Sequence, residues 1–236
     1  MSIDSDNKNA APGGGRRNSD IHIIISFVSL AAFLALLYLV IMHKTAAFDD
    51  AVRFFFYDMR SDGLTIFAEF ITFLGSVKWI IALCIILLLI KPLRISFGVP
   101  VSAGALSVTI INKIIKILVQ RERPDLIFRL VDESGFSFAS GHSVTSMVVY
   151  GLLIYLVRRN VRNRTAADIL TVILAIPLTG IGLSRIYLGV HYPTDVLAGW
   201  CLGLTAVMLI IEITESIRQR RNLPQNLPQN KFNHKK

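Results

Sequence analysis

Histidine, cationic and carboxylate residues recur at short spacings in the second half of the sequence. His191 and Asp195 lie four residues apart, so their side chains share one face of a beginning helix. Pro193 suits the first turn of that helix, where its missing N–H is tolerated. A carboxylate beside an imidazole fixes the tautomer and leaves the second ring nitrogen free to attack. We therefore predict an oriented histidine nucleophile at this pair.

Two cations precede this pair. Lys116 and Arg123 are seven residues apart, which is almost two helical turns, so both share one helix face if the helix persists to Pro124. Two cations on one face form an anion clamp, and arginine engages phosphate through two parallel hydrogen bonds. The alternative is that both side chains extend along the helix to reach lipid headgroups.

A third segment, Ser140-Gly141-His142, directly precedes an apolar run. A serine and a glycine that open a helix offer free backbone N–H groups and a hydroxyl, which favour an anion. The histidine can supply a proton near neutral pH. The alternative is a serine that only caps the helix, next to a histidine with no catalytic role.

The composition defines the setting of these residues. The 236-residue chain is 53% hydrophobic, with a mean hydropathy of +0.56 and a net charge of +9. This hydrophobicity excludes a disordered chain and argues against an ordinary soluble domain. The basic residues are scattered between apolar segments, which indicates membrane orientation rather than a nucleic-acid surface. Cys84 and Cys201 lie inside apolar runs, so no disulfide framework is expected.

The apolar segments predict an all-α fold, a polytopic membrane bundle of six transmembrane helices with an interfacial helix between the first two. A span needs about 20 apolar residues. The first span is predicted to be a retained anchor, and the charged, aromatic segment 43–62 suits the membrane interface. A short re-entrant or interfacial helix is predicted from residue 64 to an interruption at Gly75 and Ser76. The predicted spans cover residues 21–42, 77–90, 95–120, 143–157, 166–183 and 192–211.

Flanking charges orient this bundle. Residues 1–20 are interpreted as a flexible cytoplasmic tail, residues 21–217 as the six-span domain and residues 218–236 as a second cytoplasmic tail. With both termini in the cytoplasm, every predicted cytoplasmic segment carries lysine or arginine, as the positive-inside rule requires. A second group of cations faces outward, where the positive-inside rule does not require them. This placement favours a functional role for these residues, which are Lys116, Arg121, Arg123, Arg129 and Arg185.

Together the three segments resemble the tripartite signature of the type 2 phosphatidic acid phosphatase superfamily. The matching residues are Lys116-x6-Arg123-Pro124, Ser140-Gly141-His142 and Ser184-Arg185-x5-His191-x3-Asp195, and the resemblance extends over residues 48–211. It implies a lipid phosphatase that needs no metal or cofactor, because protein cations stabilise the transition-state charge. One departure is Ala139, which stands where the family usually has proline and is expected to loosen the loop.

The resemblance also assigns roles to single residues. His191 is implied as the nucleophile that forms a phosphohistidine intermediate, Asp195 as the carboxylate that orients it, and His142 as the general acid for the leaving group. The implied phosphate-binding residues are Lys116, Arg123, Ser140, Gly141 and Arg185. The acidic residues Asp132 and Glu133 are interpreted as solvated loop charges, with a role in substrate choice as the alternative.

The implied substrate is a lipid phosphate or pyrophosphate at the extracytoplasmic face of the plasma membrane. The resemblance favours undecaprenyl pyrophosphate, with phosphatidylglycerophosphate or phosphatidic acid next. Neither nucleic acid nor an obligate protein partner is expected.

Three other classes share part of this pattern. A transporter would hold its ionisable residues near the bilayer midplane, whereas these residues gather at one end of the spans. The vanadate-dependent haloperoxidases share the site by resemblance, but they are soluble proteins. A binding-only relative would keep the phosphate-binding residues and release no phosphate.

Overall fold

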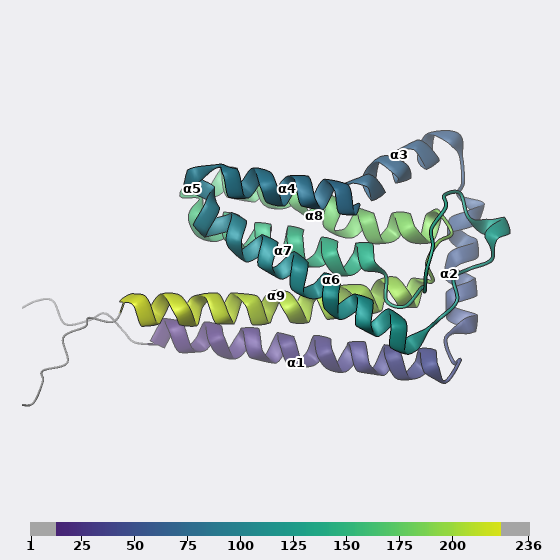
Figure 1. Ribbon diagram of the computed structural model, residues 1–236, viewed down its shortest axis with the longest axis horizontal. Coiled ribbons are helices and arrows are strands. Elements are labelled where there is room, and N and C mark those ends of the chain that lie inside the picture. Colours follow the sequence, from purple (N-terminus) through teal and green to yellow (C-terminus); the bar gives the residue numbers. More distant parts are fainter. Residues whose placement is uncertain (1–12, 223–236) are drawn as a thin grey trace, which may run out of the picture.

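The computed structural model describes the backbone of residues 13–222 and the side chains of residues 19–217. All regular secondary structure in these residues is helical (Figure 1), which confirms the predicted all-α class. The elements are α1 (Gly13–Ile41), α2 (Ala46–Asp58), α3 (Asp62–Phe73), α4 (Val77–Leu89), α5 (Lys91–Leu93), the π-helical turn η1 (Arg94–Gly98), α6 (Val99–Val119), the 3-10 turn η2 (Leu126–Phe128), α7 (Gly141–Asn160), α8 (Arg164–Tyr187) and α9 (Pro193–Asn222).

The helix α7 forms the centre of the bundle. It packs against α6, α8 and α9, while α1 packs against α9 (Figure 1). Buried side chains lie on several sides of α7, among them Val144, Val148, Val149 and Leu152. A helix that is buried all round belongs to the core, so α7 is the element against which the others are positioned.

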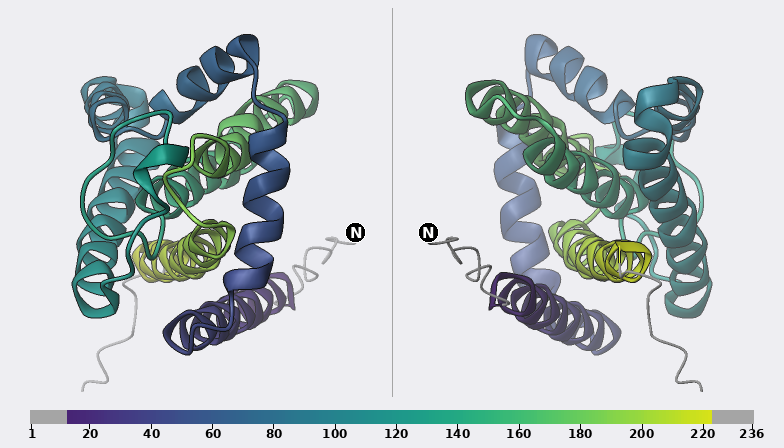
Figure 2. Two further views of the ribbon diagram at one scale, coloured as in Figure 1. Left: turned by 90° about the vertical axis from the view of Figure 1, so that its right-hand side faces the viewer. Right: turned by 90° about the vertical axis from the view of Figure 1, so that its left-hand side faces the viewer.

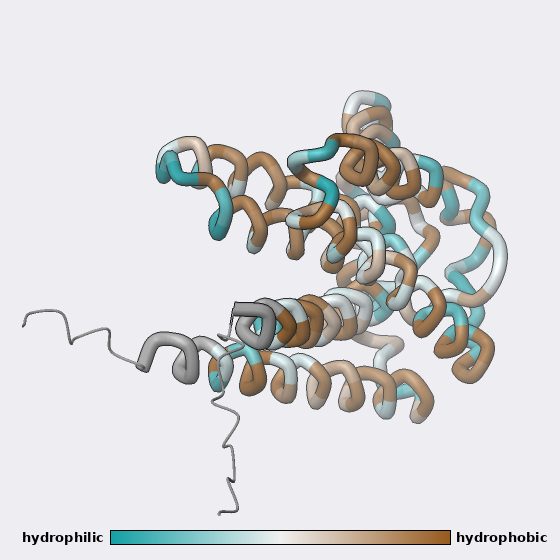
Figure 3. The backbone as a smooth tube through the Cα atoms, turned by 60° about the vertical axis from the view of Figure 1, so that its left-hand side comes forward, coloured by the Kyte–Doolittle hydropathy of each residue, from teal (hydrophilic) through white to brown (hydrophobic). Residues whose placement is uncertain are grey.

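Four helical segments of the described chain are long and apolar enough to cross a membrane: Ser19–Ile41, Lys91–Val119, Arg164–Tyr187 and Pro193–Ile217. The bent pair α3 and α4 adds a fifth if it counts as one span. The central α7 is less apolar because it contains serines such as Ser143 and Ser146. Both are buried within the protein, so they do not face lipid. Apolar residues predominate along the helices, and polar residues gather at helix ends and connections (Figure 3). The chain is therefore a multi-pass membrane protein.

The helices α2 and α3 connect α1 to α4. Crosswise to the long helices, α2 runs over one end of the bundle (Figures 1 and 2). The helices α3 and α4 meet at an angle of 47°, which confirms the predicted interruption at Gly75 and Ser76. The Ser76 hydroxyl caps α4 by accepting a hydrogen bond from the Trp79 N–H at 3.3 Å. The bend brings Gly75 against α8, where an added Cβ would lie 2.6 Å from the Ile181 Cγ2 methyl group.

The first and last helices reach further than the predicted spans. The helix α1 begins at Gly13 and α9 ends at Asn222, so helix continues into both segments interpreted as tails. The rest of those tails, residues 1–12 and 223–236, lies outside the described residues. These helix ends lie at the end of the bundle opposite α2 (Figure 1).

Candidate active site

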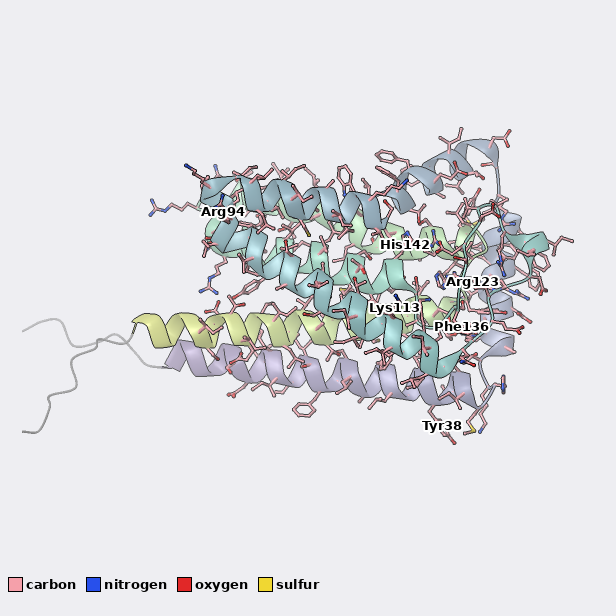
Figure 4. All side chains as sticks on the ribbon, viewed as in Figure 1. Tyr38, Arg94, Lys113, Arg123, Phe136 and His142 are labelled. Atoms are coloured by element: carbon pink, nitrogen blue, oxygen red, sulfur yellow. The ribbon has the colours of Figure 1, made fainter. Side chains whose placement is uncertain are left out.

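The predicted catalytic and phosphate-binding residues converge at the end of the bundle that α2 crosses, where Figure 4 shows Arg123 and His142. The helix α6 ends at Val119, and the C-cap residue Gln120 has a left-handed backbone with a φ of 51°. The condition under which Lys116 and Arg123 would share one helix face, a helix that persists to Pro124, is therefore not met, because only the lysine is helical. The loop brings the arginine back to the site, and the Ser137 N–H closes this loop by donating to the Arg121 carbonyl at 2.7 Å.

The predicted pair of His191 and Asp195 is formed. Nδ1 of the histidine lies 3.4 Å from Oδ2 of the aspartate, and the two side chains are 2% and 0% exposed. The Ser137 hydroxyl donates to the same Oδ2 and lies 3.2 Å from Nδ1. The Tyr192 N–H also donates to Oδ2, at 3.0 Å. These contacts fix one edge of the imidazole, so Nε2 faces away from the carboxylate.

Arg123 occupies that other edge. Its NH1 nitrogen lies 3.1 Å from Nε2 of His191 and donates to the Val190 carbonyl at 2.8 Å. Its Nε donates to the Gly135 carbonyl at 2.9 Å. Burial lowers the pKa of Arg123 to about 10, although the carboxylate of Glu133 acts in the opposite direction. The guanidinium is therefore a fixed cation at neutral pH.

Its surroundings keep the His191 imidazole neutral. Burial lowers the pKa of His191 well below its ordinary value of 6.5, and the nearby cations Arg123 and Arg185 lower it further. Both effects penalise the imidazolium form. A neutral imidazole has a lone pair available for attack on an electrophile.

A cavity of about 540 Å³ opens in front of His191. From this polar end, the cavity continues between α4 and α6 along apolar side chains that include Ile81, Ile85 and Leu106. The arrangement joins an anion-binding end to an apolar groove, as an amphiphile with a charged headgroup requires. Five predicted site residues line the polar end: Lys116, Arg123, Gly141, His142 and His191.

The helix α6 holds the loop that precedes α7. Nζ of Lys116 donates to the carbonyls of Phe136 and Ser137, the latter at 3.1 Å. One helical turn earlier, Nδ2 of the buried Asn112 donates to the Ala139 carbonyl at 3.3 Å. These contacts hold the loop at a position where the family usually has proline.

Two predicted phosphate-binding residues lie beside the cavity instead of on its described wall. The Ser140 hydroxyl caps α7 by accepting from the Ser143 N–H at 3.4 Å, and the two hydroxyls are 2.9 Å apart. In these bonds Ser140 acts as a helix cap, which is the role that the sequence offered as the alternative to phosphate binding. Arg185 donates to the carboxylate of Glu133 and, at 3.1 Å, to the Thr72 hydroxyl.

Glu133 connects Arg185 to the cavity. Its carboxylate pairs with Arg185 and lies 3.7 Å from an Arg123 guanidinium nitrogen. The interpretation of Glu133 as a solvated loop charge is therefore wrong, because two site cations hold it at the cavity wall with 29% of its side chain exposed. The carboxylate meets the same cations that a phosphate group in the cavity would meet.

Sequence reasoning missed a second layer of residues behind the histidine. Arg121 donates to Oδ1 of Asp195 and to Oδ2 of Asp49, both at 2.7 Å. The sequence identifies Arg121 only as an outward-facing cation, and Asp49 only as one charge in an aromatic segment. No spacing points to Ser137, whose hydroxyl contacts both members of the pair.

The fold and these residues are similar to those of known proteins. The sequence pattern of the PAP2 superfamily matches residues 97–218, which contain all three predicted segments. Phosphatidylglycerophosphatase B of Bacillus subtilis (strain 168) is 37% identical over 116 residues, 48% of this chain and 55% of that protein. Decaprenylphosphoryl-5-phosphoribose phosphatase of Mycobacterium tuberculosis (strain ATCC 25618 / H37Rv) is 39% identical over 121 residues, 50% of this chain and 61% of that protein. The chain thus spans less than two thirds of these curated relatives.

A solved structure extends the similarity to most of the chain. The crystal structure of the transmembrane PAP2-type phosphatidylglycerolphosphate phosphatase from Bacillus subtilis has a TM-score of 0.74 and 28% sequence identity. The similarity covers 81% of this chain and 96% of that one. It therefore includes helices outside the segment that the family pattern matches.

Proposed function

The chain belongs to the PAP2 superfamily, and from this premise we propose that it hydrolyses a phosphate monoester or pyrophosphate of a membrane lipid. His191 is the nucleophile and is phosphorylated during turnover. The reaction takes place at the extracytoplasmic face of the plasma membrane and needs neither a metal nor a cofactor.

The observation that carries this proposal is the environment of His191. Asp195 and Ser137 lie at Nδ1, while Nε2 faces Arg123 at the polar end of the cavity. A neutral imidazole with one free nitrogen, next to a cation that can bind phosphate oxygens, is equipped to attack phosphorus.

In the first step, Nε2 of His191 forms a bond to phosphorus, and the bond from phosphorus to the leaving oxygen breaks. Asp195 accepts the Nδ1 hydrogen bond and stabilises the positive charge that develops on the ring. Arg123, Lys116 and Arg185 stabilise the negative charge on the phosphoryl oxygens. With the negatively charged substrate bound, the imidazolium form of His142 gives its proton to the leaving alcohol or phosphate.

In the second step, a water molecule attacks the phosphohistidine. His142, now deprotonated, accepts a proton from that water, in keeping with microscopic reversibility. The bond between phosphorus and Nε2 breaks, inorganic phosphate leaves, and the imidazole of His191 returns to its neutral form.

The groove between α4 and α6 supports a lipid substrate. Its wall includes Ile81, Ile85 and Leu106, and it runs from the cationic end toward the apolar part of the bundle. A hydrocarbon chain in this groove gains about 0.8 kcal/mol for each CH₂ group removed from water, so a lipid chain would hold the headgroup at the site.

The fold and its charges support the membrane arrangement of this proposal. Six spans result when α7 is counted with the four apolar segments and with α3 and α4 together. The helix α2 lies in the outer interface, where its exposed Phe54 and Phe55 contact lipid. Lys91 and Arg94 lie at the opposite end of the bundle (Figure 4 labels Arg94), so the positive-inside rule puts both termini in the cytoplasm.

Two lipids are the first substrates to test. The names of the relatives from Bacillus subtilis support phosphatidylglycerophosphate. The name of the relative from Mycobacterium tuberculosis supports a polyprenyl-linked phosphate, a class close to the undecaprenyl pyrophosphate that the sequence resemblance favours. The order of preference between the two stays a prediction.

Phosphate release by the detergent-purified protein tests this function. We expect release from at least one of phosphatidylglycerophosphate, undecaprenyl pyrophosphate and phosphatidic acid, with excess EDTA present. His191→Ala, folded to the same extent, should lose activity by at least about 10²- to 10⁴-fold. Phosphate-lipid binding without release from any of the three would favour a binding-only relative, and solute flux without release would favour a transporter.

A further inference from the structure

Asp49 is a buried carboxylate outside the proposed reaction centre. It lies in the first turn of α2, and its side chain is 0% exposed. A buried charge is costly unless it is paired and hydrogen-bonded. The partners of Asp49 therefore indicate what this charge does.

One set of partners lies at the start of α9. Oδ1 of Asp49 accepts a hydrogen bond from the Thr194 N–H at 2.9 Å, and Oδ2 accepts one from the Thr194 hydroxyl at 2.9 Å. The first N–H groups of a helix have no partner within the helix. Asp49 thus supplies, from α2, a cap for α9 one residue before Asp195.

The other partner is Arg121. One terminal nitrogen of this guanidinium donates to Oδ2 of Asp49 at 2.7 Å, and the other donates to Oδ1 of Asp195 at 2.7 Å. The same guanidinium stacks over the Tyr192 ring, 4.0 Å from its centroid. Arginine suits this position because its planar fork can join two carboxylates in fixed directions.

Asp49 therefore reaches Asp195 by two routes, through the backbone of α9 and through Arg121. In the described part of the chain, neither Asp49 nor Arg121 lines the cavity in front of His191. Their hydrogen bonds lead toward the reaction centre through Asp195 and the start of α9.

The geometry points to Asp49 as a positioning residue for the proposed reaction: it holds the Asp195 carboxylate at the angle that orients His191. In this way α2, which crosses the end of the bundle, sets the alignment of the nucleophile. The inference rests on the proposed function of the histidine and adds to it a residue that neither the three sequence segments nor the family match includes.

Asp49→Asn tests this role, with Asp50→Asn as the matched control. The first change removes the negative charge and replaces one of the two accepting oxygens by an NH₂ group, which can only donate. Asp50, by contrast, pairs with Arg53 and is 48% exposed. We expect kcat to fall about 10- to 100-fold in Asp49→Asn, with KM within about twofold, because misalignment of a reacting group costs rates of this size. Asp50→Asn should keep both constants. An Asp49→Asn protein with the kcat of the wild type would overturn the inference.

A double-mutant comparison separates positioning from general stability. If Asp49 acts through Asp195, the double variant Asp49→Asn/Asp195→Asn should have the same kcat as Asp195→Asn alone. The inference would be contradicted if the two substitutions lowered kcat by independent factors that multiply in the double variant. It would also be contradicted if the lost activity of Asp49→Asn were explained by a smaller amount of folded protein. Arg121→Lys provides the second test if Asp49→Asn does not fold, with the same expected loss of kcat. A wild-type protein that releases no phosphate, or an active His191→Ala, would instead contradict the proposed function.

Discussion

The guanidinium of Arg123 lies against the second ring nitrogen of His191, with 3.1 Å between NH1 and Nε2. The arginine comes from the loop after α6, and 68 positions separate the two residues in sequence. One cation thus has two effects at the same place. It lowers the pKa of the imidazole, and in the proposed reaction it binds the oxygens of the phosphate that the imidazole attacks.

This contact predicts how activity depends on pH. Because burial and the nearby cations lower the pKa of His191 below 6.5, the imidazole stays neutral until the pH falls below that value. The acid limb of kcat/KM should therefore lie below pH 6.5. Arg123→Gln removes one of the cations, so the pKa should rise and the acid limb should move to higher pH.

The pH profiles of kcat/KM for the two proteins check this result. A reduced rate alone is uninformative, since Arg123 also binds phosphate in the proposed reaction. An acid limb that stays in place or moves to lower pH in Arg123→Gln would contradict the electrostatic account of the histidine.

Glu133 predicts a competition between protein and phosphate. Its carboxylate lies against Arg185 and near Arg123, so an incoming phosphate must share these cations with a negative charge. Glu133→Gln should strengthen inhibition by inorganic phosphate, lowering the inhibition constant about 3- to 10-fold. Asp132→Asn is the matched control, because the neighbouring Asp132 is exposed. Equal inhibition constants for the two variants would show that Glu133 does not compete.

The packing of α8 on α9 predicts a sensitive glycine. A Cβ at Gly182 would lie 2.5 Å from Cζ2 of Trp200, a rigid aromatic atom. Gly182→Ala should lower the stability of the folded protein by about 1–3 kcal/mol, because inserted atoms force neighbouring side chains apart. Gly63→Ala is the control, since nothing lies within 4 Å of a Cβ at that position. Thermal unfolding in detergent should give a lower midpoint for Gly182→Ala than for the control.

The contact between His191 and Asp195 was predicted correctly, but spacing along one helix is not its cause. The helix α9 begins at Pro193, so Asp195 lies in its first turn and His191 precedes the helix. The same reasoning failed for Lys116 and Arg123, where the left-handed Gln120 ends the helix between them. Both cations still reach the cavity, since the loop that follows returns to the site.

Pairs that are distant in sequence could not be predicted from spacing. Asp49 and Thr194 are separated by 145 positions and Glu133 and Arg185 by 52, so only the tertiary fold brings them together. Hydropathy did predict a helix over residues 143–157, within α7, although α7 is not among the most apolar segments, because a helix surrounded by protein needs no lipid-facing surface. The sequence therefore indicates the reacting groups more clearly than the residues that hold them.

The central claim is that His191 carries the phosphoryl group, and rapid-quench labelling tests it most directly. The enzyme is mixed with the lipid that it hydrolyses fastest, radiolabelled in the departing phosphate, and quenched in alkali because phosphohistidine is labile in acid. We predict a transient, alkali-stable label on the peptide that contains His191, and no label and no turnover in His191→Ala. Label on another residue, or phosphate release at the wild-type rate by His191→Ala, would contradict the account.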